Sequence, residues 1–205
     1  MVDYSNIFVN EGLSYTDYRK LVDTLLLEGK TTGADHSESM LHYSKLNVQR
    51  MSRADKTLML TEGLKEKIDR LSGTFRLLVI AEGWCGDAAQ LVPLFDKIRQ
   101  YAPHTFELKL VLRDQHLPLI DAHLTHGGRA IPVLLVLDPQ GALLSKWGPR
   151  PAVLQELLTG WKAESPDMFA VAEKLHLWYA KDKTLTAQEE IGQLLAKLAP
   201  QPGSN

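Results

Sequence analysis

The chain of 205 residues contains a single cysteine, Cys85. One cysteine excludes an internal disulfide, an all-cysteine zinc site and a paired-cysteine redox motif. The sequence also lacks any run of about 18 apolar residues, so no membrane-spanning helix is predicted. Its N-terminus has no positively charged flank followed by an apolar run, so no secretory signal is expected. A lone unpaired thiol suits a reducing cytoplasm, which is the predicted location.

Neither sign of charge is in clear excess. Lysine and arginine number 23, aspartate and glutamate number 25, and the formal net charge is −2. This balance favours no nucleic-acid partner, and the basic residues Arg50, Arg53 and Lys56 are interpreted as a solvated helix face. The histidines at 116, 123 and 126 have no neighbouring cysteine and match no ligand motif, so we expect no metal site.

Proline is absent before Pro93, which permits long helices in the first part of the chain. Apolar residues recur there at helical spacing, which predicts helices over 14–29, 37–52 and 55–71. Residues 1–73 are therefore predicted to form a helical N-terminal extension.

The pattern changes after Gly73. Short apolar runs predict strands, and periodic segments between them predict helices. The predicted strands are 77–81, 106–112, 131–137 and 142–147, and the predicted helices are 85–101, 117–124 and 152–161. This alternation indicates an α/β fold with a mixed sheet of four to five strands, parallel in part and ending in a hairpin.

Two further helices are predicted after this region. One spans 167–181, and the other runs from Thr186 to about residue 198, because Thr186 and Glu189 have the spacing of a capping box. The chain is thus divided into an extension over 1–73, a central domain over 74–163 and a C-terminal helical extension over 164–205. We expect these three parts to form one compact unit.

Cys85 lies where a buried strand becomes a helix. Unpaired backbone N–H groups and the helix dipole favour a nucleophilic thiolate at such a position. The alternative is a buried cysteine that acts as a small apolar side chain. Asp87, two residues on, raises the thiol pKa by repulsion if it is ionised, although an acid in the first helical turn also simply suits the dipole. The sequence does not decide between these alternatives.

Several spaced residues resemble the thioredoxin superfamily. They are Trp84-Cys85-Gly86, then Pro93, then Ile131-Pro132, then Gly148. The resemblance implies a thioredoxin-like fold, with Trp84 beside the sulfur and a cis peptide bond before Pro132 where an extended substrate can pair. A trans proline that begins an edge strand is the alternative for Pro132.

A narrower resemblance is to a bacterial branch of thioredoxin-like proteins with a helical N-terminal extension. The residues that carry it are Arg113-Asp114, Leu119, Asp121, the run from Leu124 to Pro132 and the segment Lys45–Met51. Within that run, Arg129 precedes the proline strand and is a candidate contact for an anionic substrate, with a solvated side chain as the alternative.

Two departures from the thioredoxin pattern bear on function. Ala88 stands where a dithiol thioredoxin has its second cysteine, so the chain is a single-cysteine variant with the sequence Trp-Cys-Gly-Asp-Ala. The buried carboxylate that the family has on the strand before the motif is also missing, since its place falls among Leu78, Val79 and Ile80. The usual intramolecular dithiol cycle is therefore unavailable.

The resemblance and the departures together predict a monothiol thiol–disulfide oxidoreductase. Cys85 would attack a disulfide or mixed disulfide of a protein or small molecule, and an external low-molecular-weight thiol would resolve the product. No cofactor beyond that thiol is expected, and the supporting residues are Trp84, Gly86, Asp87, Ala88, Arg129, Ile131 and Pro132. The alternative is a redox-inactive thioredoxin-fold protein that binds extended peptides or serves as a scaffold.

Overall fold

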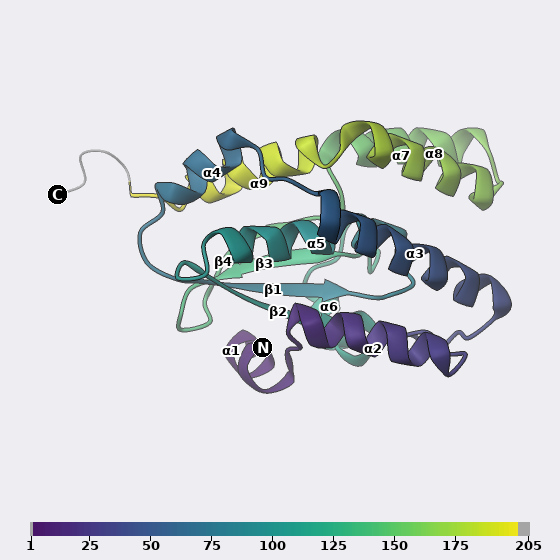
Figure 1. The fold of residues 1–205 in the computed structure, drawn as a ribbon, viewed down its shortest axis with the longest axis horizontal. Helices are drawn as coiled ribbons and strands as arrows, with labels where there is room; N and C mark the ends of the chain where they lie inside the picture. The colour runs from purple at the N-terminus through teal and green to yellow at the C-terminus, as the bar shows by residue number, and fades with distance from the viewer. Residues whose placement is uncertain (1, 201–205) are drawn as a thin grey trace.

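The computed structural model describes residues 2–200, so the outermost residues of the predicted extensions lie outside it. A four-stranded sheet stands at the centre, with helices on both sides (Figure 1). Its strands are β1 (Phe75–Ala81), β2 (Phe106–Leu112), β3 (Val133–Leu137) and β4 (Leu143–Trp147), in the spatial order β2-β1-β3-β4. The predicted mixed α/β sheet with helical extensions is confirmed.

The sheet combines one parallel and two antiparallel pairs. β1 is parallel to β2 and antiparallel to β3, and β3 and β4 form the predicted antiparallel hairpin. Five of the seven β1 residues are 0% or 2% exposed, and all five of β3 are at most 2% exposed. Strands covered on both faces read as continuous apolar runs, which is why the sequence identified them.

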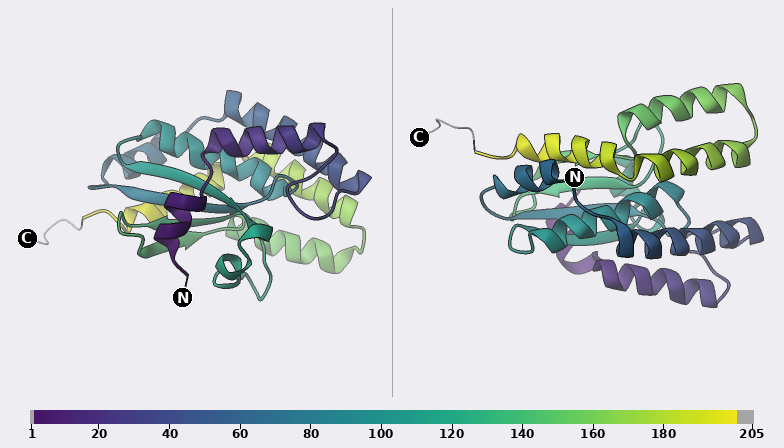
Figure 2. Two further views of the ribbon diagram at one scale, coloured as in Figure 1. Left: turned by 90° about the horizontal axis from the view of Figure 1, so that it is seen from below. Right: turned by 45° about the horizontal axis from the view of Figure 1, so that its top comes forward.

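The helix α5 (Gly86–Tyr101) follows β1 directly and packs against β1 and β2. After β2 come the 3₁₀ turn η2 (Arg113–Gln115) and the short helix α6 (Leu117–Asp121). Figure 2 shows α6 on the side of the sheet away from α5. α5 begins shortly after the end of β1, which lies between β2 and β3 in the sheet. Cys85, at the start of α5, therefore lies at an edge of the core.

The N-terminal residues form more elements than predicted. Their bounds are α1 (Tyr4–Asn6), the π turn η1 (Ile7–Glu11), α2 (Tyr15–Leu27), α3 (Glu38–Thr57) and α4 (Glu62–Asp69). The predicted helix boundaries at 52 and 55 are wrong, because α3 continues to Thr57 and residues 58–61 connect it to α4 as an irregular segment. The Thr61 hydroxyl accepts from the N–H of Leu64 at 3.2 Å and so caps α4.

The C-terminal residues form α7 (Ala152–Glu164), α8 (Met168–Asp182) and α9 (Leu185–Ala196). α7 packs on α8, and α9 packs on α4 beside the sheet (Figure 1). The predicted capping box is wrong: the Thr186 hydroxyl donates to Asp182, and Glu189 accepts from Lys67 at 2.8 Å. Thr184, in a left-handed conformation, is the residue that precedes α9.

Both extensions contact the central sheet or its helices. α3 packs along α5, and Leu13 exchanges two backbone hydrogen bonds of 2.8 Å with Leu110 on the outer edge of β2. α9 contacts β4. None of the helices among residues 2–200 is long and apolar enough to cross a membrane.

Candidate functional site

The thiol of Cys85 lies at the head of α5. Cys85 is the N-cap residue of this helix, and its Sγ donates to the carbonyl oxygen of Ile131 at 3.3 Å. The Ile131–Pro132 peptide bond is cis, as predicted. The sequence motif and the proline strand, far apart in the chain, therefore meet at one sulfur atom.

Gly148 packs closely against the backbone of Pro132. Its φ is +120°, and a Cβ built on it would lie 2.4 Å from the carbonyl oxygen of Pro132. The position therefore requires glycine, both for its backbone conformation and for the close approach. A second cis bond, Gly148–Pro149, follows immediately and was not predicted from the sequence.

The thiol is buried and held in its neutral form. Cys85 is 9% exposed, and burial raises its pKa to about 12, with repulsion from Asp87 adding to the rise. The backbone N–H groups of Ala88 and Asp87 and the charge of Arg150 act in the opposite direction and lower the pKa. Burial outweighs the helix terminus in its effect on the pKa, which favours a protonated thiol.

Asp87 belongs to a buried cluster that joins α5 to the C-terminal part of the chain. Its carboxylate accepts from Arg150 Nη2 at 2.7 Å and from the Tyr179 hydroxyl at 2.6 Å. The side chains of Asp87 and Arg150 are 7% and 11% exposed. The sequence analysis missed Arg150 and Tyr179, because they lie 63 and 92 residues from Asp87 and carry no local motif.

The N-terminal extension holds the loop that precedes Cys85. The Thr32 hydroxyl accepts from the N–H of Gly83 at 3.0 Å, and the buried Asn47 donates its Nδ2 to the carbonyl oxygen of Gly83, also at 3.0 Å. Gly33 lies against the Trp84 ring, where a Cβ would meet Nε1 at 2.7 Å. The extension is therefore part of the structure that positions the cysteine.

Trp84 and Ala88, on either side of Cys85 in the chain, pack in different ways. The guanidinium of Arg113 stacks over the Trp84 ring at 4.6 Å from its centroid, and the ring is partly buried. Ala88 lies in the first turn of α5, and its side chain is 1% exposed and belongs to the core. Gly86 packs against His176 of α8, which would lie 2.7 Å from a Cβ at that position.

Arg129 is placed differently. It forms a bidentate ion pair with Asp121, with Nε–Oδ1 and Nη2–Oδ2 distances of 2.6 and 2.8 Å, and both side chains are nearly half exposed. Its guanidinium is thus already paired with a carboxylate at the surface.

The site contains a buried carboxylate that the sequence analysis did not anticipate. Glu82, at the end of β1, is 0% exposed, and burial raises its pKa from the usual 4.5 to about 7. It accepts from the Thr32 hydroxyl and, at 3.0 Å, from the N–H of Asp114. No acid occupies the strand positions 78–80, as the sequence shows, and Glu82 is a buried carboxylate at a different position.

We expect the buried Glu82 to make stability depend on pH. Its folded-state pKa is raised, so the contribution of Glu82 to the unfolding free energy is fully present below pH 4.5 and is lost as the pH rises through about 7. The shift corresponds to about 3 kcal/mol. The Glu82→Gln variant should lack this fall, as measured by urea unfolding at a series of pH values. The exposed Glu156→Gln variant is the control, and equal pH dependence of Glu82→Gln and wild type would contradict the assignment.

His116 and His123, considered from the sequence, contact different partners. His123 lies 3.0 Å from the Tyr4 hydroxyl, whereas His116 lies 3.6 Å from Glu11. Among residues 2–200, no group of three histidine, cysteine, aspartate or glutamate side chains is arranged to hold a metal ion.

Comparison with known proteins agrees with this geometry. The family model described as Thioredoxin matches residues 33–164. The chain belongs to the thioredoxin family. The match begins before α3, so the family pattern includes the helices α3 and α4 as well as the sheet.

Solved structures show the same fold. One is a protein of unknown function, PA1234, from Pseudomonas aeruginosa, with a TM-score of 0.62 and 20% identity over 97% of this chain and 100% of that one. Another is an HIV epitope scaffold, with a TM-score of 0.53 and 19% identity over 91% of this chain and 100% of that one. No curated protein matches the sequence. These likenesses support the thioredoxin fold and leave the activity to be argued from the site.

Proposed function

We propose that this thioredoxin-family protein is a monothiol thiol–disulfide oxidoreductase that uses Cys85 alone. The observation that supports the proposal is the meeting of the Cys85 thiol, at the N-cap of α5, with the cis Ile131–Pro132 segment. Backbone N–H groups at the helix start stabilise negative charge on the sulfur as a bond forms or breaks. The neighbouring backbone of residues 131 and 132 offers an edge for an extended or disulfide-bearing ligand.

The reaction balances without a second protein thiol. The substrate is a mixed disulfide P–S–S–R between a protein, P, and a small thiol, R–SH. Cys85 attacks the sulfur attached to R, so that a Cys85 Sγ–S bond forms and the S–S bond of the substrate breaks. The sulfur of P leaves as a thiolate and takes up the proton that Cys85 loses. A free thiol R–SH then attacks the sulfur of R, releases R–S–S–R and returns the proton to Cys85. The protein thiol P–SH is reduced and R–SH is oxidised, so the external thiol supplies the electrons.

The test is turnover of a glutathionylated peptide by wild type and by Cys85→Ser, with glutathione as the external thiol. We expect wild type to exceed the variant by at least about tenfold and to form a mixed disulfide at Cys85 that mass spectrometry detects. Because the pKa of Cys85 is raised to about 12, the rate of its reaction with iodoacetamide should rise with every pH step from 7 to 10. Below the pKa this rise is about tenfold per pH unit.

The buried, neutral thiol favours a second candidate, a redox-inactive protein that binds extended peptides beside Pro132. The same experiment separates the two candidates. Turnover no faster than that of Cys85→Ser at every pH would overturn the oxidoreductase. Retained binding of extended peptides by that variant would then support the binding protein.

A further inference from the structure

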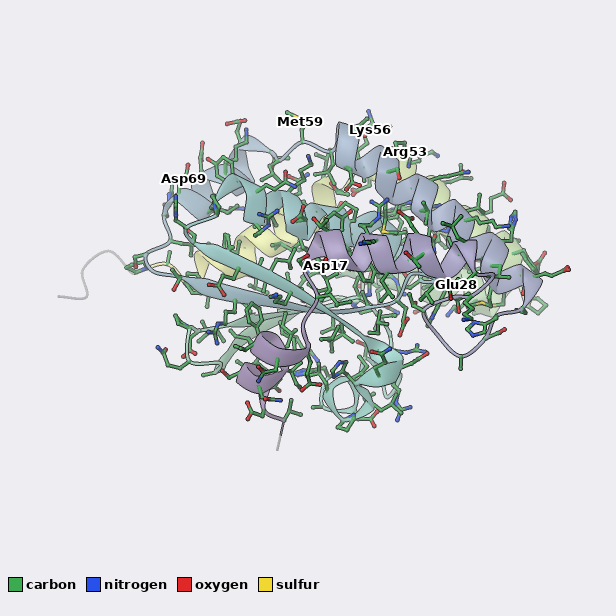
Figure 3. All side chains as sticks on the ribbon, turned by 60° about the horizontal axis from the view of Figure 1, so that its bottom comes forward. Asp17, Glu28, Arg53, Lys56, Met59 and Asp69 are labelled. Atoms are coloured by element: carbon green, nitrogen blue, oxygen red, sulfur yellow. The ribbon has the colours of Figure 1, made fainter. Side chains whose placement is uncertain are left out.

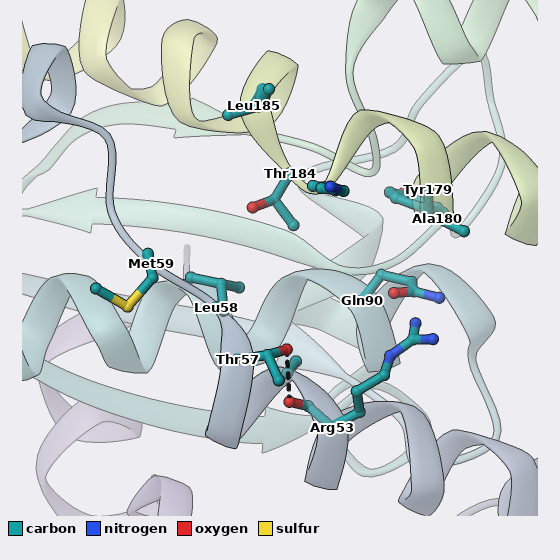
Figure 4. A pocket seen from close by; sticks show the side chains of 11 residues that line it. Arg53, Thr57, Leu58, Met59, Gln90, Tyr179, Ala180, Thr184 and Leu185 are labelled. Carbon is teal, nitrogen blue, oxygen red and sulfur yellow. Dashed lines mark hydrogen bonds between the residues drawn. The ribbon is translucent and has the colours of Figure 1, made fainter.

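A groove runs between α3 and α8 over the surface of α5. It consists of two adjoining cavities of about 540 and 440 Å³, which share Arg53, Gln90 and Ala180 as lining residues. Figure 4 shows the first cavity, with the Arg53 side chain directed toward Gln90. We call these two cavities together the α3–α8 groove. Their size is that of small-molecule sites in proteins.

The groove is lined by cations that lack carboxylate partners. Arg50, Arg53 and Lys183 line it, and none of the three forms an ion pair within residues 2–200. Glu173 is the one carboxylate among the described lining residues. Net positive charge in a concave site attracts anions.

Arg50 is unusual among these cations because it is partly buried. It donates to the Asn47 amide oxygen at 2.7 Å, and burial together with repulsion from Arg53 lowers its pKa. The interpretation of Arg50 as part of a solvated helix face is therefore wrong. A partly desolvated guanidinium beside a second one is stabilised when a carboxylate or phosphate binds both.

Two contacts join the groove to the residues that flank Cys85, although Cys85 itself lines neither cavity. Asn47, which holds Arg50, also holds the carbonyl oxygen of Gly83, two residues before the cysteine. On the other side His176 lines the groove, lies 3.5 Å from Gln90, and packs on Gly86, the residue after the cysteine. Burial and the charge of Arg50 lower the pKa of His176 to about 4, so its ring is neutral and offers a hydrogen bond rather than a charge.

We propose that the α3–α8 groove binds a small disulfide or thiol that bears carboxylates, with its acidic groups on Arg50 and Arg53 and its sulfur toward Cys85. This inference rests on the proposed function and names the substrate class of the same site. When a bound disulfide reacts, its S–S bond breaks as the bond to Cys85 forms. The departing sulfur then leaves as a thiolate and takes the proton of Cys85.

Other surfaces fit an acidic ligand less well. Arg129, the anion contact considered from the sequence, is already paired with Asp121. Lys56, next to Arg53 at the outer edge of α3 in Figure 3, does not line either cavity. The α3–α8 groove thus combines a concave volume, unpaired cations and contacts with the residues that flank Cys85.

The experiment measures binding of oxidised glutathione, a disulfide with carboxylates on both halves, to the unreactive Cys85→Ser protein by titration calorimetry. Adding Arg50→Gln and Arg53→Gln should weaken binding by about tenfold or more. Adding Lys56→Gln should leave it unchanged. Cystamine, a disulfide with amines in place of carboxylates, should not bind. Equal binding with and without the two arginines, or equal binding of cystamine, would overturn the groove proposal.

A second measurement separates this proposal from the proposed function. With Cys85 intact, the rate of mixed-disulfide formation with oxidised glutathione is followed by mass spectrometry. The rate should fall about tenfold in the double arginine variant, while the rate with cystamine stays the same. Arginine-dependent binding without any mixed disulfide would support the groove as an acid-binding site and refute only the redox activity of Cys85.

Discussion

Replacing Arg150 with glutamine is expected to lower the free energy of unfolding by about 3–5 kcal/mol, because the change leaves the carboxylate of Asp87 buried without its cation. Asp87 and Arg150 are 7% and 11% exposed at the side chain and are joined by a bond of 2.7 Å between Nη2 and Oδ2. Tyr179 still donates one hydrogen bond to Asp87, but a neutral hydroxyl does not balance the charge. Urea unfolding at pH 7 measures the loss.

The matched control is the exposed ion pair of Arg129 with Asp121, whose side chains are 46% and 45% exposed. Arg129→Gln should cost between about 0 and 1 kcal/mol, because solvent screens a surface pair. The double variant Asp87→Asn with Arg150→Gln should recover part of the stability, since no unpaired charge remains. A loss in Arg150→Gln no larger than in Arg129→Gln would refute the assigned role of the buried pair.

Replacing Ala88 with cysteine is expected to give the protein an internal disulfide and a dithiol activity. The Ala88 backbone N–H is close enough to act on the Cys85 sulfur, and its side chain is 1% exposed on the first turn of the same helix. A second thiol there can attack a mixed disulfide on Cys85 and release the substrate. Reduction of insulin with dithiothreitol should rise by about tenfold or more over wild type.

The control for this gain of function is the Cys85→Ser, Ala88→Cys double variant, which has one thiol in the new position. It should form no internal disulfide and should reduce insulin no faster than Cys85→Ser. Thiol titration of Ala88→Cys after mild oxidation gives an independent readout. If both of its thiols remain free, the helix start does not bring the two side chains together as the fold implies.

The sequence predicted the parts of the fold that depend on local patterns. The apolar runs of β1 and β3 identified the buried strands, and the strand-to-helix change placed Cys85 at the start of α5. The cis bond at Pro132 followed from the thioredoxin resemblance, because the proline lies at the matching place before the hairpin.

The electrostatics of the site were not predictable from the sequence. The pKa of Cys85 depends on how deeply its sulfur is buried. Part of the packing around it comes from His176 of α8, which lies against Gly86 and is distant from it in the sequence. Glu82 lies just before the motif, yet its hydrogen-bond partners are Thr32 and Asp114, which lie 50 and 32 residues away in the chain. Contacts between residues so distant in sequence leave no periodicity or spacing to detect.

The burial and raised pKa of Cys85 bear on how fast its thiol is oxidised by hydrogen peroxide. Hydrogen peroxide attacks exposed thiolates and carries them to sulfenic, sulfinic and sulfonic acids, of which the last two are lasting damage. A sulfur that is 9% exposed, hydrogen-bonded to the Ile131 carbonyl and neutral at physiological pH resists the first of these steps. We therefore expect the resting thiol to react slowly with hydrogen peroxide.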